Sequence, residues 1–188
     1  MNLISRFSSW LLKTLGWTMH ADYPDAEKYV MIVAPHTSNW DFVLGIVASR
    51  ALKLHAHFMG KHTVFVWPIG WFFRALGGLP VDRRRAENLI QQMADLFTTS
   101  DRPILALAPE GTRTKKDHWK TGFYHIARAA KVPIAMAYLD YGKRQVGFGG
   151  TFYPGDDIEE VFARIREFYK DRRGKFPEQE SLIQIRKE

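Results

Sequence analysis

Hydrophobic and polar positions follow two different periods along this chain. Short continuous apolar runs, which are typical of strands buried on both faces, occur at 29–34, 104–108 and 134–139. Helices are predicted between and after these runs, at 41–52, 84–97, 122–130 and from 156 onward. Strands that alternate with helices predict an α/β fold, a single domain with a central, largely parallel sheet flanked by helices. Ligands of such sheets gather at the carboxyl ends of the strands.

Weaker patterns complete this picture. A short strand is expected at 56–59, and 145–153 is predicted to be an edge strand or a hairpin. Asp156 is expected to cap the last helix, because Glu159 follows it at the spacing of a capping box. The aromatic segment 64–79 is interrupted by Pro68 and Gly70, which makes it a poor candidate for a membrane-spanning helix.

The first residues of the chain form an amphipathic pattern with little charge. Arg6 and Lys13 are the only charged side chains before Asp22, and the apolar residues at helical spacing are Leu3, Ile4, Phe7, Trp10, Leu11, Leu12 and Leu15. Residues 1–20 are therefore predicted to be a helix that lies on a membrane surface, with a helix packed on its own domain as the alternative. Residues 21–170 form the main domain of this prediction, and 171–188 form a charged, loose surface tail.

Composition limits the function classes. The formal net charge of +7 points to anionic partners, which include nucleic acid, anionic lipid and phosphorylated substrates. Six Trp and 13 Phe favour a lipid interface among these, because amphipathic rings are well suited to that environment. The absence of cysteine excludes disulfides, thiolate metal sites and a cysteine nucleophile, and it fits a reducing, cytosolic setting.

Polar residues with catalytic potential follow the first apolar run directly. His36 comes just after that predicted strand, and Asp41 begins the next helix. The turn between them can bring the carboxylate to one imidazole nitrogen, which would fix the tautomer and leave the other nitrogen free to take a proton from an alcohol. The sequence equally allows a helix cap beside an ordinary histidine.

A second polar segment, Glu110–Thr114, follows the next long apolar run. Gly111 allows close backbone approach, Thr112 supplies a hydroxyl, and the guanidinium of Arg113 is able to bind a phosphate in bidentate fashion. A plain turn is the alternative. No convincing set of metal ligands accompanies either segment, so no metal is predicted.

Taken together, the two segments resemble the sequence blocks of the glycerolipid and lysophospholipid acyltransferases. His36-Thr-Ser-Asn-Trp-Asp41 resembles their His-x4-Asp block, and Glu110-Gly-Thr-Arg113 resembles their third block. Gly78–Arg83 is similar to the second block, and Val132-Pro-Ile134 is similar to the start of the fourth. Met136 stands where the family usually has a second proline. Blocks in this order are more specific than any one of them.

The resemblance implies roles for named residues. His36 and Asp41 would be the catalytic pair, and Arg83 and Arg113 would bind the phosphate of the acceptor. Lys61 occupies the place of a basic residue associated with phosphate binding, and Gly111 and Thr112 would shape that pocket. Asn39 and Glu110 would shape the site, with Glu110 orienting its neighbours through hydrogen bonds. Independently of the resemblance, the aromatic residues Trp67, Trp71, Phe72 and Phe73 are interpreted as a lipid-facing ridge, the wall of an acyl tunnel, or ordinary core.

The implied activity is acyl transfer from acyl-CoA or acyl carrier protein to the hydroxyl of a lysophospholipid, with lysophosphatidic acid as the default acceptor. His36 would deprotonate the hydroxyl for direct attack on the thioester. No cofactor is expected beyond the acyl donor, which is a co-substrate. The expected location is the cytoplasmic face of a membrane, with an anionic surface and no nucleic acid as partner. Hydrolysis of the thioester and non-enzymatic binding of anionic lipid or nucleic acid are the alternatives.

Overall fold

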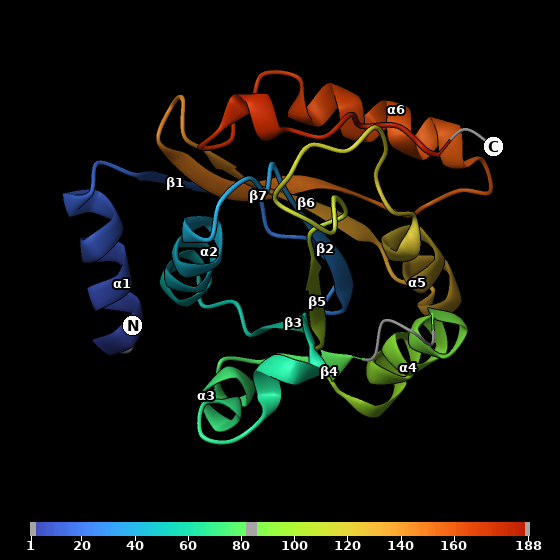
Figure 1. The fold of residues 1–188 in the computed structure, drawn as a ribbon, viewed down its shortest axis with the longest axis horizontal. Coiled ribbons are helices and arrows are strands. Elements are labelled where there is room, and N and C mark those ends of the chain that lie inside the picture. The colour runs from blue at the N-terminus through green and yellow to red at the C-terminus, as the bar shows by residue number, and fades with distance from the viewer. Residues whose placement is uncertain (1–2, 82–85, 187–188) are drawn as a thin grey trace.

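The computed structural model describes residues 3–81 and 86–186. A seven-stranded sheet in the order β1-β7-β6-β2-β5-β3-β4 lies at its centre (Figure 1). The strands are β1 (Thr18–Ala21), β2 (Tyr29–Ala34), β3 (Ala56–Lys61), β4 (Gly78–Val81), β5 (Ile104–Leu107), β6 (Ile134–Asp140) and β7 (Gln145–Phe152). The helices are α1 (Leu3–Thr14), α2 (Trp40–Ala51), α3 (Gly70–Ala75), α4 (Ala86–Thr99), α5 (Gly122–Ala130) and α6 (Ile158–Tyr169), with 3-10 helices η1 (His62–Phe65) and η2 (Pro177–Gln179).

The predicted α/β fold with a largely parallel sheet is confirmed. Neighbouring strands of this sheet are parallel, apart from the antiparallel pair of β6 and β7. The hairpin predicted at 145–153 is therefore correct, but β7 is not an edge strand, because β1 pairs with its other side. Strand β1 was not predicted, since four residues with mixed polarity give too short a signal.

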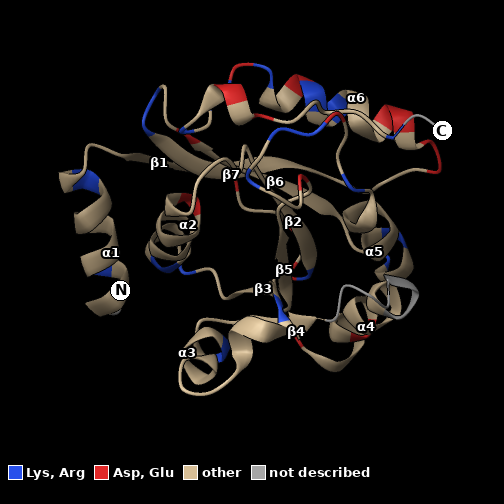
Figure 2. Ribbon diagram, in the orientation of Figure 1, with Lys and Arg blue, Asp and Glu red and all other residues tan. Residues whose placement is uncertain are grey.

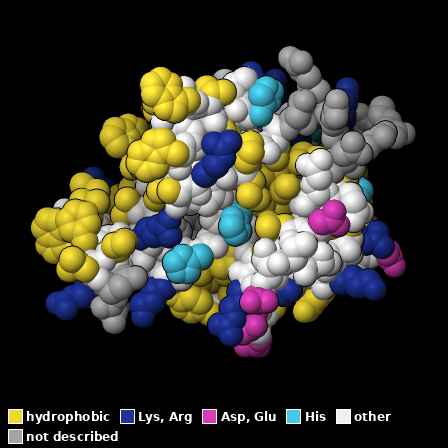
Figure 3. Space-filling view, turned by 90° about the horizontal axis from the view of Figure 1, so that it is seen from below, with side chains coloured by type: hydrophobic (Ala, Val, Ile, Leu, Met, Phe, Trp, Pro, Cys, Tyr) yellow, Lys and Arg dark blue, Asp and Glu magenta, His cyan; other side chains and the backbone are white. Residues whose placement is uncertain are grey.

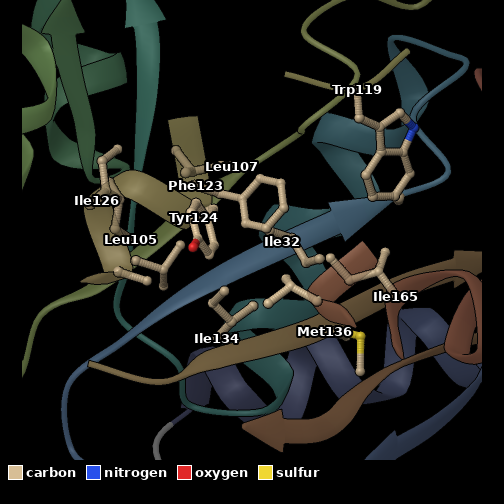
Figure 4. Close-up of a cluster of buried hydrophobic side chains, with 14 of the residues drawn as sticks. Ile32, Leu105, Leu107, Trp119, Phe123, Tyr124, Ile126, Ile134, Met136 and Ile165 are labelled. Atoms are coloured by element: carbon tan, nitrogen blue, oxygen red, sulfur yellow. The ribbon is translucent and has the colours of Figure 1, made fainter. Parts of the chain in front are cut away.

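Buried side chains on both faces of the sheet hold the helices in place. Val30 and Ile32 of β2 belong to the core on the face that α4, α5 and α6 cover, where Phe123 and Phe162 are almost fully buried. Figure 4 shows Ile32 and Phe123 in this core. Leu139 points to the opposite face and packs in a separate cluster with residues of α1 and α2. Burial on both faces is the reason why these strands are continuous apolar runs in the sequence.

Helix α1 packs on its own domain through its less apolar side. Ser5, Ser8 and Leu12 are buried, and the Ser5 hydroxyl donates to the carbonyl of Ala51 at the end of α2 over 3.1 Å. The opposite side exposes Leu3, Ile4, Phe7 and Trp10, and Leu15 directly after the helix is exposed as well; each of these residues is more than half exposed. The helix therefore joins the domain and still presents an apolar face to its surroundings. The predicted boundary at residue 20 falls inside β1.

Two predictions about the last part of the chain are corrected by the structure. Helix α6 is capped by Asp157, whose carboxylate accepts the backbone N–H of Glu159 at 2.8 Å, whereas Asp156 pairs with Arg128. The segment predicted as a loose tail is folded back onto the domain, where Ile183 and Ile185 pack against the main core. Its many charges concealed these isolated apolar contacts.

No helix of the described part of the chain is long and apolar enough to cross a membrane.

The packing of α1 can be tested with two leucines, one inside the helix and one directly after it. Leu12 is fully buried and Leu15 is about half exposed. We expect Leu12→Ala to lower the free energy of unfolding by about 2–5 kcal/mol, because it leaves a cavity between α1 and α2. Leu15→Ala serves as the control and should change it little. Urea unfolding of both variants measures the difference, and equal effects would contradict the packing described.

Candidate active site

The two predicted polar segments meet at the carboxyl ends of neighbouring strands. Because β2 and β5 are adjacent and parallel, the loops that follow them lie at the same edge of the sheet. The backbone N–H of His36 donates to Glu110 Oε1 over 2.6 Å, which joins the loop after β2 to the loop after β5. The sequence places these residues 74 positions apart, so only the sheet brings them together.

The carboxylate of Asp41 organises the loop between β2 and α2. Its Oδ2 accepts the backbone N–H groups of Thr37 and Ser38, each at 2.8 Å, and lies 3.2 Å from His36 Nδ1. Asp41 is in the first turn of α2, where the N-terminal end of the helix favours negative charge. The residue therefore binds the backbone of its own loop and contacts the imidazole at once. It is not the helix cap that the sequence also allowed, because Asn39 is the N-cap residue of α2 and makes no side-chain cap hydrogen bond.

A tyrosine from another part of the chain completes the surroundings of Asp41. The Tyr141 hydroxyl donates to Asp41 Oδ1 over 2.7 Å. Burial by itself would raise the pKa of Asp41, but the hydrogen bonds from His36, Tyr141 and Ser38, together with the charge of His36, lower it. Burial and then the bond to Asp41 raise the pKa of Tyr141. Asp41 is therefore charged and Tyr141 neutral at physiological pH.

Sequence reasoning missed Tyr141, because it directly follows β6 and lies 100 positions from Asp41. No local motif marks it.

The geometry at His36 suits proton transfer. When Nδ1 donates to the charged Asp41, Nε2 is the nitrogen that carries the free lone pair. An imidazole held in this way takes a proton from an alcohol or water, and the carboxylate stabilises the imidazolium that forms. The arrangement is that of a general base with its orienting partner.

The pair lines a large cavity with an apolar interior. His36 and Asp41 border a cavity of about 860 Å³, within the size range of small-molecule sites. Its hydrophobic lining includes Met31, Phe42, Ile46, Leu52, Phe58 and Ala137, which come from α2, from the residue directly after it and from several strands. A site of this kind accepts a ligand with a long apolar part and a reactive group beside the imidazole.

Positive charge lies at the same cavity. Gly111, Thr112 and Arg113 of the loop after β5 are among the lining residues, as predicted for a shared pocket. Lys120 also lines it and was not singled out from the sequence, although the basic run after Arg113 is a signal that points there. Gly111 has a φ of +66°, and a Cβ at this position would lie 2.8 Å from Lys120 Cε, so the lysine packs where only glycine leaves room.

Other predicted site residues lie elsewhere. Asn39 and Lys61 are exposed and are not among the cavity-lining residues, and Arg83 lies outside the described residues. Glu110 lies behind the loop rather than in the cavity. Its side chain is buried, which raises its pKa, although hydrogen bonds from His36 and Ser181 oppose the shift.

The aromatic segment does not form a tunnel wall. Trp67, Trp71 and Phe72 are 91%, 70% and 48% exposed, and neither they nor Phe73 line the cavity. Among the residues that the structure describes, no cluster of three or more His, Asp or Glu is placed to hold a metal ion.

The lowered pKa of Asp41 predicts a pH-dependent stability difference. Its carboxylate stabilises the fold fully above its ordinary pKa of 3.8, and this contribution is lost as the pH falls through the lower folded-state value. The difference in unfolding free energy between the wild type and Asp41→Asn should therefore be widest near neutral pH and shrink below about pH 4. Glu110 is present in both proteins, so its contribution to the pH dependence largely cancels in this difference. Denaturant unfolding across the pH range measures the difference, and a gap that stays constant down to pH 2 would contradict it.

Comparisons with known proteins agree with this geometry. A search of curated proteins found no match. A solved structure, that of the 1-acyl-sn-glycerophosphate (LPA) acyltransferase PlsC from Thermotoga maritima, is similar with a TM-score of 0.59 and 18% sequence identity, over 92% of this chain and 80% of that one. This likeness concerns the fold. The family model for Acyltransferase matches residues 18–139, which include both loops of the site, and the chain therefore belongs to the acyltransferase family.

Proposed function

We propose that the protein transfers a fatty acyl group from a thioester donor to the hydroxyl of a lysophospholipid, with lysophosphatidic acid as the first acceptor to test. The observation that carries the proposal is the His36–Asp41 pair on the wall of a large apolar cavity that also bears Arg113. An acyl chain, a reacting hydroxyl and a phosphate each find a matching environment there. Membership of the acyltransferase family and the likeness to PlsC support it.

The proposed reaction is a direct transfer. His36 Nε2 takes the proton of the acceptor hydroxyl while the oxygen attacks the thioester carbonyl carbon. The tetrahedral intermediate collapses, the bond between carbon and sulfur breaks, and the imidazolium returns its proton to the departing thiolate. The chain contains no cysteine and no Gly-x-Ser-x-Gly elbow to carry an acyl-enzyme, which favours this direct route without a covalent enzyme intermediate. Acyl-CoA and acyl carrier protein both supply the required thioester.

The acceptor phosphate is proposed to bind at the basic end of the cavity. Arg113 offers a bidentate contact, and Lys120 lies beside Gly111 of the same loop. A phosphate held there would keep the glycerol hydroxyl near His36. Holding the reacting groups close together in this way raises the rate of acyl transfer. Arg83 and Lys61 stay predictions as further phosphate contacts.

We further propose that the protein works at the cytoplasmic surface of a membrane. Exposed apolar side chains of α1 lie on the same side of the molecule as those of the η1–α3 segment, as the view from below shows (Figure 3). Both helices carry Lys or Arg and no acidic residue, whereas α6 carries both signs (Figure 2). Apolar rings next to basic side chains suit an anionic lipid surface.

The central test is His36→Ala. We expect the variant to fold like the wild type and to lose acyl transfer by about 10²–10⁴-fold, because it lacks the general base. A labelled acyl thioester with a panel of lysophospholipid acceptors, followed by lipid analysis, measures it. Undiminished transfer by His36→Ala would end the proposal. Free fatty acid as the sole wild-type product, independent of acceptor, would assign the protein as a thioester hydrolase.

The membrane proposal has its own test. A Phe7→Ser, Trp10→Ser double variant removes two exposed rings of α1 and should weaken binding to vesicles that contain phosphatidylserine, because less apolar surface is buried in the lipid. Tyr153→Ser is the matched control, since Tyr153 is also an exposed ring, at 68%, but lies just beyond β7. Vesicle co-sedimentation measures both. Equal losses in both variants, or none in either, would contradict a role of α1 in docking.

A further inference from the structure

The segment after α6 crosses both loops of the active site. We call residues 173–184 the C-terminal strap. They lie outside the part of the chain that the family model matches, 18–139, and their sequence is dominated by charged and polar residues. The backbone N–H of Tyr141 donates to the carbonyl of Arg173 over 2.8 Å, which fixes the start of the strap next to the tyrosine that binds Asp41.

The strap packs directly against the loop that contains His36. The backbone N–H of Phe176 donates to Thr37 Oγ1 over 3.2 Å. Gly174 is buried, and a Cβ at this position would lie 2.8 Å from Thr37 Oγ1 and 3.2 Å from Pro35 Cβ. Its backbone N–H donates to Glu180 Oε1 over 2.7 Å, so the strap is also held in its own turn. The glycine is what allows the strap to lie against the loop.

The strap also holds the loop after β5. Ser181 Oγ accepts the backbone N–H of Lys116 at 3.1 Å, and Ser181 is near enough to the carboxyl of Glu110 to oppose the rise of its pKa. Further along, the backbone N–H of Trp119 donates to the carbonyl of Gln184 over 2.9 Å. Glu180, Ser181 and Ile183 of the strap line a cavity of about 40 Å³ together with Glu110 and Trp119. Residues of the strap therefore form part of the surroundings of the carboxyl that accepts the N–H of His36.

One side chain of the strap joins the two loops directly. With its amide oriented so that both ends are satisfied, Gln179 donates to the carbonyl of Arg113 over 2.6 Å and to the carbonyl of Thr37 over 3.2 Å. The amide of Gln179 therefore fixes the backbone of Thr37, next to His36, relative to the backbone of Arg113, the residue proposed to bind the phosphate.

We propose that the C-terminal strap is a positioning element that sets the separation between the His36–Asp41 pair and the Arg113 loop, with Gly174 and Gln179 as its positioning residues. The inference rests on the proposed function, in which the hydroxyl and the phosphate of one acceptor are held at these two loops at once. A displacement of about 1 Å in such an arrangement is enough to lower a rate by as much as 10²-fold. The strap therefore bears on turnover without touching a substrate.

The first variant is Gly174→Ala, with Gly155→Ala as its matched control. The added methyl group at 174 pushes the strap away from Thr37, whereas a Cβ at 155 meets no heavy atom within 4 Å. We expect Gly174→Ala to lower kcat for the lysophospholipid acceptor about 10-fold or more while KM for the acyl donor stays unchanged. Gly155→Ala should behave like the wild type.

The second variant is Gln179→Glu, with Gln92→Glu at an exposed position of α4 as the charge-matched control. A carboxylate of the same size cannot donate to the carbonyls of Arg113 and Thr37. We expect a lower kcat and a higher KM for phosphate-bearing acceptors, with a smaller loss for an acceptor that lacks the phosphate.

Amide hydrogen exchange provides a readout that does not depend on activity. In both strap variants the N–H groups of Thr37 and Ser38, which donate to Asp41, should exchange faster, while those of the β6 core stay protected. Folded strap variants with wild-type kinetics and wild-type exchange would overturn the proposal. If the wild type transfers no acyl group, the proposed function fails, and the exchange result alone still decides whether the strap holds the loops.

Discussion

The charged carboxylate of Asp41 is the interaction on which the rest of the site depends. It accepts hydrogen bonds from two backbone N–H groups of its own loop, lies within reach of the imidazole of His36, and accepts the hydroxyl of Tyr141. Removing a charge from water is costly, and these donors together offset that cost and keep the pKa of Asp41 low. The same carboxylate therefore holds the loop, fixes the tautomer of His36 and lies at the start of α2.

The remainder of the molecule surrounds the His36–Asp41 pair with both apolar and positively charged side chains. On one side lies an apolar cavity lined by residues of α2, α4, α5 and the sheet, and Arg113 and Lys120 are also among its lining residues. Helix α1 and the η1–α3 segment expose apolar side chains to the surroundings of the protein. The proposed amphiphilic acceptor would match this distribution. Its acyl chain requires apolar surroundings, its hydroxyl requires a general base, and its phosphate requires cationic side chains. The strap connects these parts through backbone contacts, which explains why a polar segment is buried at Gly174 and Ser181.

Much of the fold was predictable because strands buried on both faces produce long apolar runs. The strand 29–34 and the helix 122–130 agree with β2 and α5 residue for residue. The short strand β1 and the packed strap were not predicted, because each depends on contacts with distant residues rather than on its own periodicity. The apolar pattern of residues 1–20 gave the helix correctly, but only the structure shows that its small polar side packs on α2.

The local sequence by itself indicated the family and the contact between His36 and Asp41, because these two residues are five positions apart and one turn is sufficient to join them. Only the tertiary structure decided the contacts between residues that are far apart in the sequence. It placed Glu110 against the backbone of His36, brought Tyr141 to Asp41, and laid Gln179 across both loops. Such contacts leave no periodic signal in the chain, since they arise only when parallel strands align their carboxyl ends and the last helix returns the chain to that edge.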